Sequence, residues 1–268
     1  MNRLPIVAGN WKMHKSIAEA RALVEGLKPR IAGLAGVEVV VCPPYTAIAA
    51  VREAAAGSGI ALGAQDVFWK EKGAYTSQVA PGMLVDAGCR YVIIGHSENR
   101  GRFGVPEPEM TEALCRWFGE TDESVNAKTK AALAAGLVPI VCVGETLEDR
   151  RAGRTDAVIA AQVERGLAGL SAGQVAGLVV AYEPVWAIGT GETCDTPEAD
   201  RVCGVIRGVL AAGFGDGAAG SARIQYGGSV KPGNARELFS QPHIDGGLVG
   251  GASLESDSFA QIVRAAVP

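Results

Sequence analysis

The chain has 268 residues, 48% of them hydrophobic and 20% charged, with a formal net charge of −4, and this length is enough to bury a large core. The acidic balance, without a Lys/Arg cluster, disfavours nucleic-acid binding, and no apolar run approaches the ~20 residues of a membrane helix. The N-terminus lacks the apolar segment of a signal peptide, and the six cysteines show no metal-binding spacing. We therefore expect a cytoplasmic protein with reduced thiols, no metal, and neither nucleic acid nor membrane as a partner.

Short apolar runs alternate with longer helix-like segments along the chain. The runs are rich in Val and Ile, and polar residues, Gly or Pro follow each of them. Continuous apolarity is typical of strands that are covered on both faces, as in a parallel sheet. The eight predicted strands are residues 5–8, 37–42, 60–64, 91–94, 138–143, 178–182, 223–226 and 247–249.

Between these runs the pattern predicts helices, with start signals of their own. Ser16 and Glu19 form a capping box, and Thr196 is expected to cap a helix with Pro197 in its first position. Eight strands alternating with helices favour a single (β/α)8 barrel domain over residues 1–268, because nothing between the runs resembles a linker. Periodicity alone leaves a doubly wound open sheet as the alternative. The clearest helical segments are residues 16–27, 129–135 and 197–210.

Polar and ionisable residues gather just after the apolar runs. Asn10 and Lys12 follow the first run, His96 follows the fourth, and Glu183 follows the sixth. In a (β/α)8 barrel these positions lie at the carboxyl ends of the strands, where active sites form. A purely structural barrel has little reason to place such groups at one end, so we expect a catalytic site there.

Each of these side chains has a chemical and a structural interpretation. His96 could donate to a substrate carbonyl, or it could be a core histidine held by one backbone bond. Glu183 could be a general base whose pKa is raised by a partly apolar setting, or it could pair with an arginine. Lys12 and Asn10 could stabilise a developing oxyanion, although a solvated lysine is the usual explanation for such a residue.

Glycine pairs follow the last two runs, at residues 227–229 and 250–251. Loops after strands 7 and 8 of such barrels commonly bind phosphate through backbone N–H groups, and Gly permits a close approach, although tight turns also use Gly. Residues 189–191 lack the further glycine of a dinucleotide fingerprint and are better interpreted as a mobile loop. A base, an electrophile and a phosphate cradle together suggest proton transfer beside the carbonyl of a small sugar phosphate.

Five segments of the chain resemble the triosephosphate isomerase family, in the family's order and across nearly the whole sequence. The resemblance implies a TIM barrel that interconverts dihydroxyacetone phosphate and D-glyceraldehyde 3-phosphate, in glycolysis and gluconeogenesis, without a cofactor. The segments are GNWKM at 9–13, IGHSE at 94–98, YEPVWAIGTG at 182–191, YGGSVKP at 226–232 and LVGGASL at 248–254.

The resemblance also implies a role for each strand-end residue. Glu183 would move a proton between C1 and C2 through an enediolate, and His96 would polarise the carbonyl as a neutral imidazole. Lys12 and Asn10 would assist at the oxyanion, with the carboxylate of Glu98 near Lys12.

Phosphate binding and a closing lid are implied in the same way. Backbone groups of Gly189, Ser229, Gly250 and Gly251 would hold the phosphate. Residues 184–191 match the family's lid, which excludes water and protects the intermediate from losing phosphate.

The family is typically a homodimer in which a loop of one subunit inserts near the active site of the other. Residues 65–81 of this chain contain the matching sequence Gly-Ala-Tyr-Thr. The resemblance therefore implies a homodimer in which Thr76 approaches Asn10 and Lys12 of the partner subunit.

The clearest departure from the family is an insertion. The family reads Phe-Gly-Glu soon after its His-Ser-Glu, whereas this chain has Phe103-Gly104 and then, 15 residues later, Phe118-Gly119. We interpret residues 104–118 as an insertion after the fourth strand.

Within the insertion, Pro108 and Glu109 precede the apolar residues Met110, Leu114 and Trp117 at helical spacing. This pattern predicts an extra amphipathic helix, with a mobile loop as the alternative. We predict that the helix packs at or beside the subunit interface.

Two smaller departures concern the interface and the lid. The family commonly pairs a Glu with an Arg where this chain has Gln78 and Asn99. An exposed pair is worth ~0–1 kcal/mol, so we expect a dimer to survive the change. Residues 192–195 make the lid hinge one residue longer than usual, and opening kinetics could differ as a result.

Two other functions stay open on the residues alone. Another sugar-phosphate isomerase or lyase of the barrel class would need different strand-end acids, and the motif around Glu183 argues against it. A catalytically silent binding protein could have kept the barrel, but intact Lys12, His96 and Glu183 argue against that interpretation.

Overall fold

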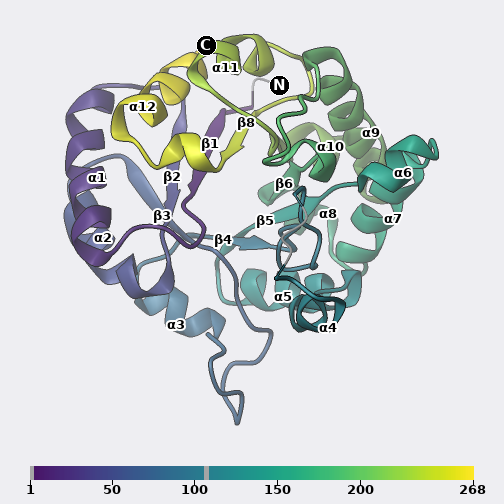
Figure 1. Ribbon diagram of the computed structural model, residues 1–268, viewed down its shortest axis with the longest axis horizontal. Coiled ribbons are helices and arrows are strands. Elements are labelled where there is room, and N and C mark those ends of the chain that lie inside the picture. The colour runs from purple at the N-terminus through teal and green to yellow at the C-terminus, as the bar shows by residue number, and fades with distance from the viewer. Residues whose placement is uncertain (1–2, 106–108) are drawn as a thin grey trace.

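Eight parallel strands close into a barrel in the order β1 to β8, which confirms the predicted (β/α)8 fold (Figure 1). The computed structural model describes residues 3–105 and 109–268. Four of the predicted strands, β3, β4, β5 and β7, have the predicted bounds. β2, β6 and β8 differ by one residue at their start, and β1 begins one residue later and ends two residues later than predicted. The strands are β1 (Ile6–Asn10), β2 (Glu38–Cys42), β3 (Ile60–Ala64), β4 (Tyr91–Ile94), β5 (Val138–Val143), β6 (Val179–Tyr182), β7 (Arg223–Tyr226) and β8 (Gly246–Val249).

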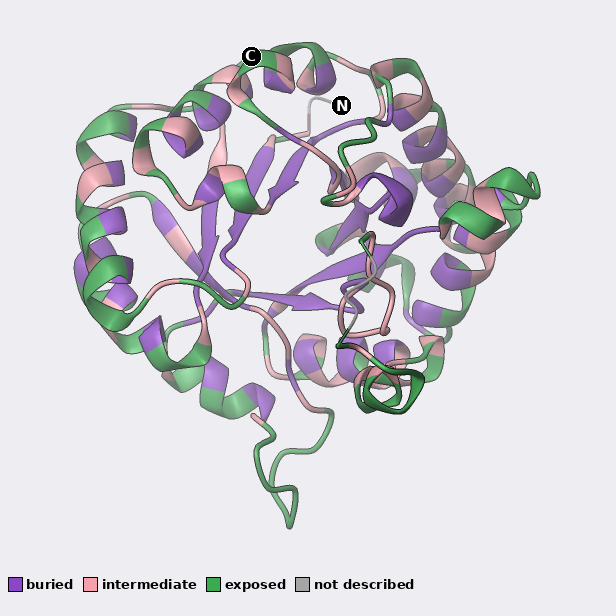
Figure 2. Cartoon of the chain, viewed as in Figure 1, coloured by how far each residue is buried: buried purple, intermediate pink, exposed green. Residues whose placement is uncertain are grey.

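Helices surround the barrel, and most of them have an exposed outer face and an inner face that is buried against the strands (Figure 2). Within the described residues none of them is long and apolar enough to cross a membrane. The helices are α1 (Ile17–Ile31), α2 (Ile48–Ala55), α3 (Pro81–Asp86), α4 (Glu112–Cys115), α5 (Asp122–Ala134), α6 (Leu147–Arg151), α7 (Thr155–Gly166), α8 (Ala172–Gly177), α9 (Thr196–Phe214), α10 (Asp216–Ser221), α11 (Pro232–Phe239) and α12 (Ser256–Ala265). Single 3₁₀ turns form at Tyr45–Ala47, Arg116–Phe118, Val185–Ala187 and Gly251–Ser253.

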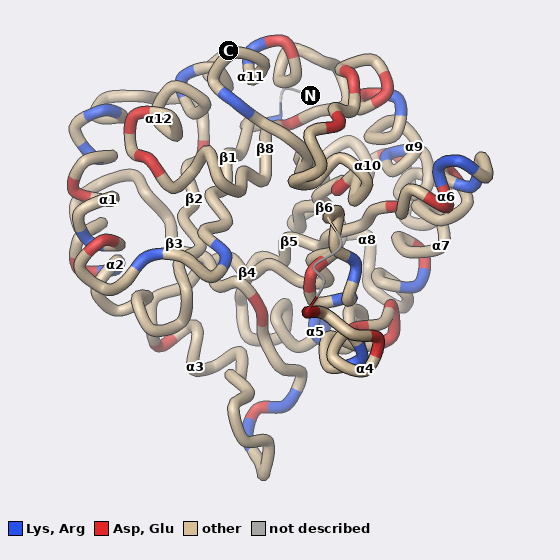
Figure 3. Tube along the Cα trace, viewed as in Figure 1, with Lys and Arg blue, Asp and Glu red and all other residues tan. Residues whose placement is uncertain are grey.

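The strands are apolar throughout because both of their faces are buried. In β5, Ile140 and Cys142 point into the barrel and belong to the inner cluster of side chains. Val141 and Val143 alternate with them and pack in the larger cluster between strands and helices. Charged residues lie mainly on the surrounding helices and loops, and the strands are largely free of them (Figure 3). The few charged groups at the strand ends therefore stand out against an apolar background.

Helix starts follow local capping chemistry. The capping box of Ser16 and Glu19 is present at the start of α1, as predicted. The predicted cap of α9 at Thr196 is wrong by one residue, because the carboxylate of Asp195 accepts the N–H of Glu198 at 2.9 Å. Pro197 then occupies the second helical position, where its missing N–H leaves no hydrogen bond unmade.

The insertion after β4 is helical, but the helix is shorter than predicted and its apolar residues are not buried. Thr111 caps α4, which has four residues and continues into the 3₁₀ turn. Leu114 is 52% exposed and Trp117 is 84% exposed, so none of the residues that the structure describes covers them. Phe118 instead packs edge-on against Phe103, with ring centroids 5.5 Å apart. The predicted start signal at Pro108 lies outside the described residues.

A buried ion cluster ties the far end of the insertion to the loop after β3. The ammonium of Lys128 on α5 lies 2.7 Å from Asp66 Oδ1 and 2.5 Å from Glu120 Oε1, and its side chain is only 8% exposed. Burial lowers the pKa of Lys128, but the two carboxylates raise it above its ordinary value. The cluster therefore holds a charged lysine in the interior, where each charge depends on the others.

We expect Lys128→Met to lower the free energy of unfolding by about 3–5 kcal/mol, because it leaves buried carboxylates without a counter-charge. Urea denaturation followed by circular dichroism measures this loss. Lys130→Met, on the exposed side of the same helix, is the matched control. A denaturation midpoint equal to that of the parent protein would contradict the prediction.

Candidate active site

A cavity of about 320 Å³ opens at the carboxyl ends of the strands. The structure brings most of the predicted site residues together around it: Asn10, Lys12, His96, Glu183, Gly189, Ser229, Gly250 and Gly251 all line the cavity. Glu98 lies outside it and contacts Lys12, and Thr76 lies on an exposed loop elsewhere. The strand-end rule thus located a shared site from positions far apart in the sequence.

Glu183 and His96 are in direct contact at the wall of this cavity. Glu183 follows β6, and its side chain is only 2% exposed. Its Oε1 lies 2.9 Å from Nε2 of His96, and its Oε2 accepts the backbone N–H of Ser97 at 3.0 Å. The carboxylate is therefore held by two donors in this state of the site.

The backbone fixes which nitrogen of His96 carries the proton in its neutral form. The N–H of Glu98 donates to Nδ1 of His96 at 3.2 Å, so Nδ1 must act as an acceptor. The proton of the neutral ring is then on Nε2, which points at Glu183. Burial lowers the pKa of His96, but the adjacent Glu183 carboxylate raises it above its ordinary value. The two contacts therefore act in opposite directions: the Glu183 carboxylate favours the protonated ring, whereas the Glu98 N–H favours a ring with Nδ1 unprotonated.

The pKa of Glu183 is lowered, whereas the sequence predicted that it would be raised. Burial raises it, but contact with His96, the N–H of Ser97 and the charge of Lys12 together lower it below its ordinary value. The sequence showed the apolar strand that precedes Glu183 but not the donors that lie against the carboxylate. In this state the Glu183 carboxylate is ionised, and each of its oxygens has a hydrogen-bond donor.

Lys12 is held in a strained backbone conformation at the end of β1. Its φ is +50°, in the left-handed region that few non-glycine residues adopt. Its N–H donates to Oδ1 of Asn10 at 3.0 Å, and its carbonyl accepts from the side chain of Gln65 at 2.8 Å. The ammonium lies 2.6 Å from Oε1 of Glu98. These contacts fix the position of the Lys12 side chain, which lines the cavity.

Two glycines of the cavity differ in how closely their neighbours approach them. A Cβ at Gly228 would lie 2.2 Å from the hydroxyl of Tyr226 and 3.0 Å from Pro184. A Cβ at Gly250 would lie 3.6 Å from Cε of Lys12. Only glycine fits at 228, whereas a side chain at 250 would come into van der Waals contact with Lys12.

A buried carboxylate that holds the start of the lid, Glu145, was not among the residues predicted from the sequence. Oε1 of the buried Glu145 accepts the indole N–H of Trp186 at 2.8 Å and the hydroxyl of Tyr182 at 3.1 Å. The guanidinium of Arg150 lies over the Trp186 ring, 4.2 Å from its centroid. Glu145 comes two residues after β5, so the same strand-end rule that singled out Glu183 could have found it.

Comparison with known proteins matches this chain over nearly its whole length. The family model described as triosephosphate isomerase matches residues 5–266. The triosephosphate isomerase of Moorella thermoacetica is 57% identical over 262 residues, covering 98% of both chains. That of Symbiobacterium thermophilum is 54% identical over 264 residues, covering 98% of this chain and 97% of the relative. A crystal structure of triosephosphate isomerase from Bartonella henselae superposes with a TM-score of 0.82 at 36% identity, covering 98% of each chain.

The closed barrel, the strand-end cavity and these relatives together define an isomerase of the TIM-barrel class. The match runs through every strand of the barrel, and two relatives share more than half of its residues. The chain belongs to the triosephosphate isomerase family.

Proposed function

We propose that this chain, acting as one barrel domain, interconverts dihydroxyacetone phosphate and D-glyceraldehyde 3-phosphate by proton transfer through an enediolate. The observation that carries the proposal is the contact between Glu183 and His96 in a cavity that also holds Lys12 and the glycine loops. A coupled assay on the purified protein tests it in both directions. Fast turnover supports the proposal, and no turnover in a folded protein overturns it. The family resemblance implies a cytoplasmic setting in glycolysis and gluconeogenesis.

In the proposed reaction Glu183 removes a proton from C1 of the ketone, and the electron pair moves toward the oxygen on C2. The oxygen gains negative charge, which the N–H of His96 Nε2, the Lys12 ammonium and the Asn10 side-chain amide are positioned to stabilise. The hydroxyl proton on the C1 oxygen then passes to the C2 oxygen. Return of the carbon-bound proton to C2, as the C1 oxygen becomes the carbonyl, completes the isomerisation. No atom is gained or lost, so the step needs no co-reactant.

Substrate entry must first separate Glu183 from His96. In the present state Oε1 of Glu183 occupies the space in front of Nε2 that a substrate oxygen would take. When Glu183 moves toward C1, the imidazole loses its neighbouring carboxylate, and burial then favours its neutral form. The exchange would release a carboxylate to act as base and leave a neutral N–H donor for the carbonyl.

The phosphate group would bind opposite the carboxylate. The donors would be the backbone N–H groups of Gly189, Ser229, Gly250 and Gly251, all of which line the cavity. Because Gly189 is on the lid, phosphate binding would draw the lid over the cavity and exclude water from the enediolate.

A homodimer is part of the same proposal. The loop between β3 and α3 projects from the barrel, with Tyr75 43% exposed (Figure 1). A second cavity of about 290 Å³, lined by Asn10 and Lys12, also reaches Gln78 on this loop. The proposed dimer places Thr76 of one subunit into this cavity of the other.

Deletion of residues 104–118 is expected to give monomers that keep the fold. A groove of about 580 Å³ is lined on one side by Trp69 of the projecting loop and on the other by Arg116 and Trp117 of the insertion. The insertion thus lies beside the loop that we assign to the interface. Light scattering measures the mass in solution, and circular dichroism monitors the fold. An unchanged dimer would count against a role for the insertion in assembly.

A further inference from the structure

The first residues of the insertion contact the lid directly. A Cβ at Gly104 would lie 2.0 Å from the carbonyl oxygen of Ile188 and 2.8 Å from that of Val185. The side chain of Val105 lies against the next lid residue, with its Cγ2 3.7 Å from where a Cβ of Gly189 would be. Only a glycine at position 104 allows the insertion to approach the lid backbone this closely.

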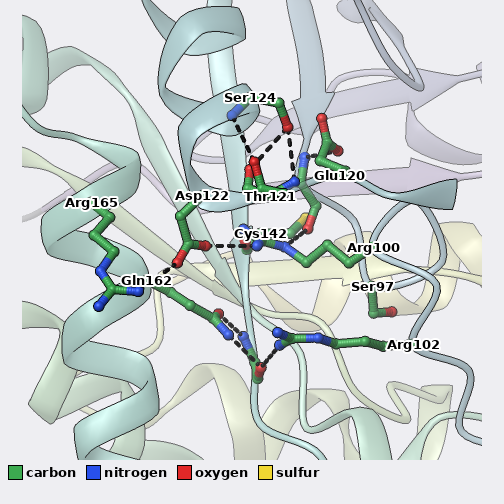
Figure 4. Close-up of polar contacts among 12 residues, drawn as sticks. Ser97, Arg100, Arg102, Glu120, Thr121, Asp122, Ser124, Cys142, Gln162 and Arg165 are labelled. Carbon is green, nitrogen blue, oxygen red and sulfur yellow. Dashed lines mark hydrogen bonds and ion pairs between the residues drawn. The ribbon is translucent and has the colours of Figure 1, made fainter. Parts of the chain in front are cut away.

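The segment that makes this contact is anchored to the barrel rather than loosely attached. The N–H of Arg102 donates to the carbonyl of Ser97 at 2.9 Å, and its guanidinium donates to the carbonyl of Gly144 at 3.3 Å. Gly144, at the end of β5, is also held at both its N–H and its carbonyl by the side chain of Gln162. Figure 4 shows Arg102 directed toward this point beside Gln162.

A second arginine strengthens the anchor. The guanidinium of Arg100 donates to the carbonyl of Gly95 at 2.8 Å and to Asp122 at 2.7 Å (Figure 4). The segment after β4 therefore passes the end of β5, where hydrogen bonds of Arg100 and Arg102 hold it. It then reaches the lid that follows β6. The lid rests against an element that the barrel holds in place.

We propose that Gly104 and Val105 are positioning residues that hold lid residues 185–189 where they are in this structure, and that phosphate binding must break this contact. The inference rests on the proposed function, in which Gly189 moves to bind the phosphate. A contact that stabilises one of two lid positions lowers the fraction of protein that is ready to bind, and so weakens apparent affinity. The insertion would thus set the balance between affinity and release.

Val105→Ala tests the contact without adding strain. We expect it to lower the Kd for inorganic phosphate and the KM for glyceraldehyde 3-phosphate about four-fold, the effect of removing about one buried methylene. We also expect faster hydrogen–deuterium exchange in residues 185–193 of the free protein. Leu114→Ala is the matched control, because Leu114 is 52% exposed, close to the 46% of Val105, and belongs to the same insertion.

Gly104→Ala is a second test, because the added Cβ would overlap the carbonyl oxygen of Ile188 and so exclude the lid from its present position. We expect the same fall in Kd and KM, while Gly173→Ala, at a helix position with open space around the added Cβ, changes neither. Unchanged or weaker phosphate binding in both variants would overturn the proposal. These outcomes are separate from the reaction itself: a parent protein without isomerase activity refutes the proposed function, whereas an active parent with unresponsive variants refutes only the lid contact.

Discussion

Replacing Glu183 with glutamine is expected to lower kcat about 10²–10⁴-fold, the range that a positioned general base contributes. The amide keeps the shape of the carboxylate and can still accept the N–H of Ser97, which now bonds to it at 3.0 Å. It cannot take a proton from carbon. A coupled assay in the direction of dihydroxyacetone phosphate formation measures the loss, with KM determined separately.

Glu53→Gln provides the matched control for this experiment. This substitution also changes a carboxylate to an amide, but it does so at an exposed ion pair with Arg21, where the Glu53 side chain is 68% exposed. Its kcat should equal that of the parent protein. If Glu183→Gln kept its circular dichroism spectrum and most of its turnover, Glu183 could not be the base.

Lys12→Met is expected to lower kcat/KM by about 10²–10³, the usual result of removing one preorganised oxyanion donor. Methionine matches the length of the lysine stem but carries no charge. The loss should exceed that from replacing an exposed surface lysine, because Lys12 lines the cavity and is held in place by Glu98 and by its own strained backbone. Steady-state kinetics with both substrates would measure it.

Lys15→Met is a close control for the loss at Lys12. Lys15 also has a positive φ and also lies near a carboxylate, with its ammonium 3.8 Å from Glu255. It does not line the cavity that holds Glu183 and His96. Equal losses from both lysine variants would assign the effect to folding of this loop rather than to charge at the oxyanion.

The sequence predicted the barrel well because burial on both faces leaves a direct mark on composition. Runs such as residues 91–94 and 138–143 are uninterrupted by charge, and their bounds agree with β4 and β5. The candidate site followed from the same pattern, because residues directly after the strands of a parallel barrel all lie at its carboxyl-terminal face. Once the barrel was assumed, the residues that follow five of the runs were therefore enough to predict a shared site.

What the sequence could not predict depends on contacts between distant groups. The pKa direction of Glu183 is set by His96 and Ser97, which no local pattern places against its carboxylate. The helix of the insertion was predicted from an apolar stripe, yet Leu114 and Trp117 are exposed because nothing in residues 3–105 and 109–268 packs over them. The contact between Gly104 and the lid could not be predicted either, because the sequence around a loop glycine does not indicate which segment it contacts.

The hydrogen bond from the backbone N–H of Glu98 to Nδ1 of His96 has a consequence for how this site could change over time. A donor that belongs to the main chain is present whatever side chain occupies position 98, with proline as the one exception. The neutral ring therefore keeps its proton on Nε2 through almost any substitution there. Loss of Glu98 would alter the charge beside Lys12 but not the tautomer, so the two properties can drift independently.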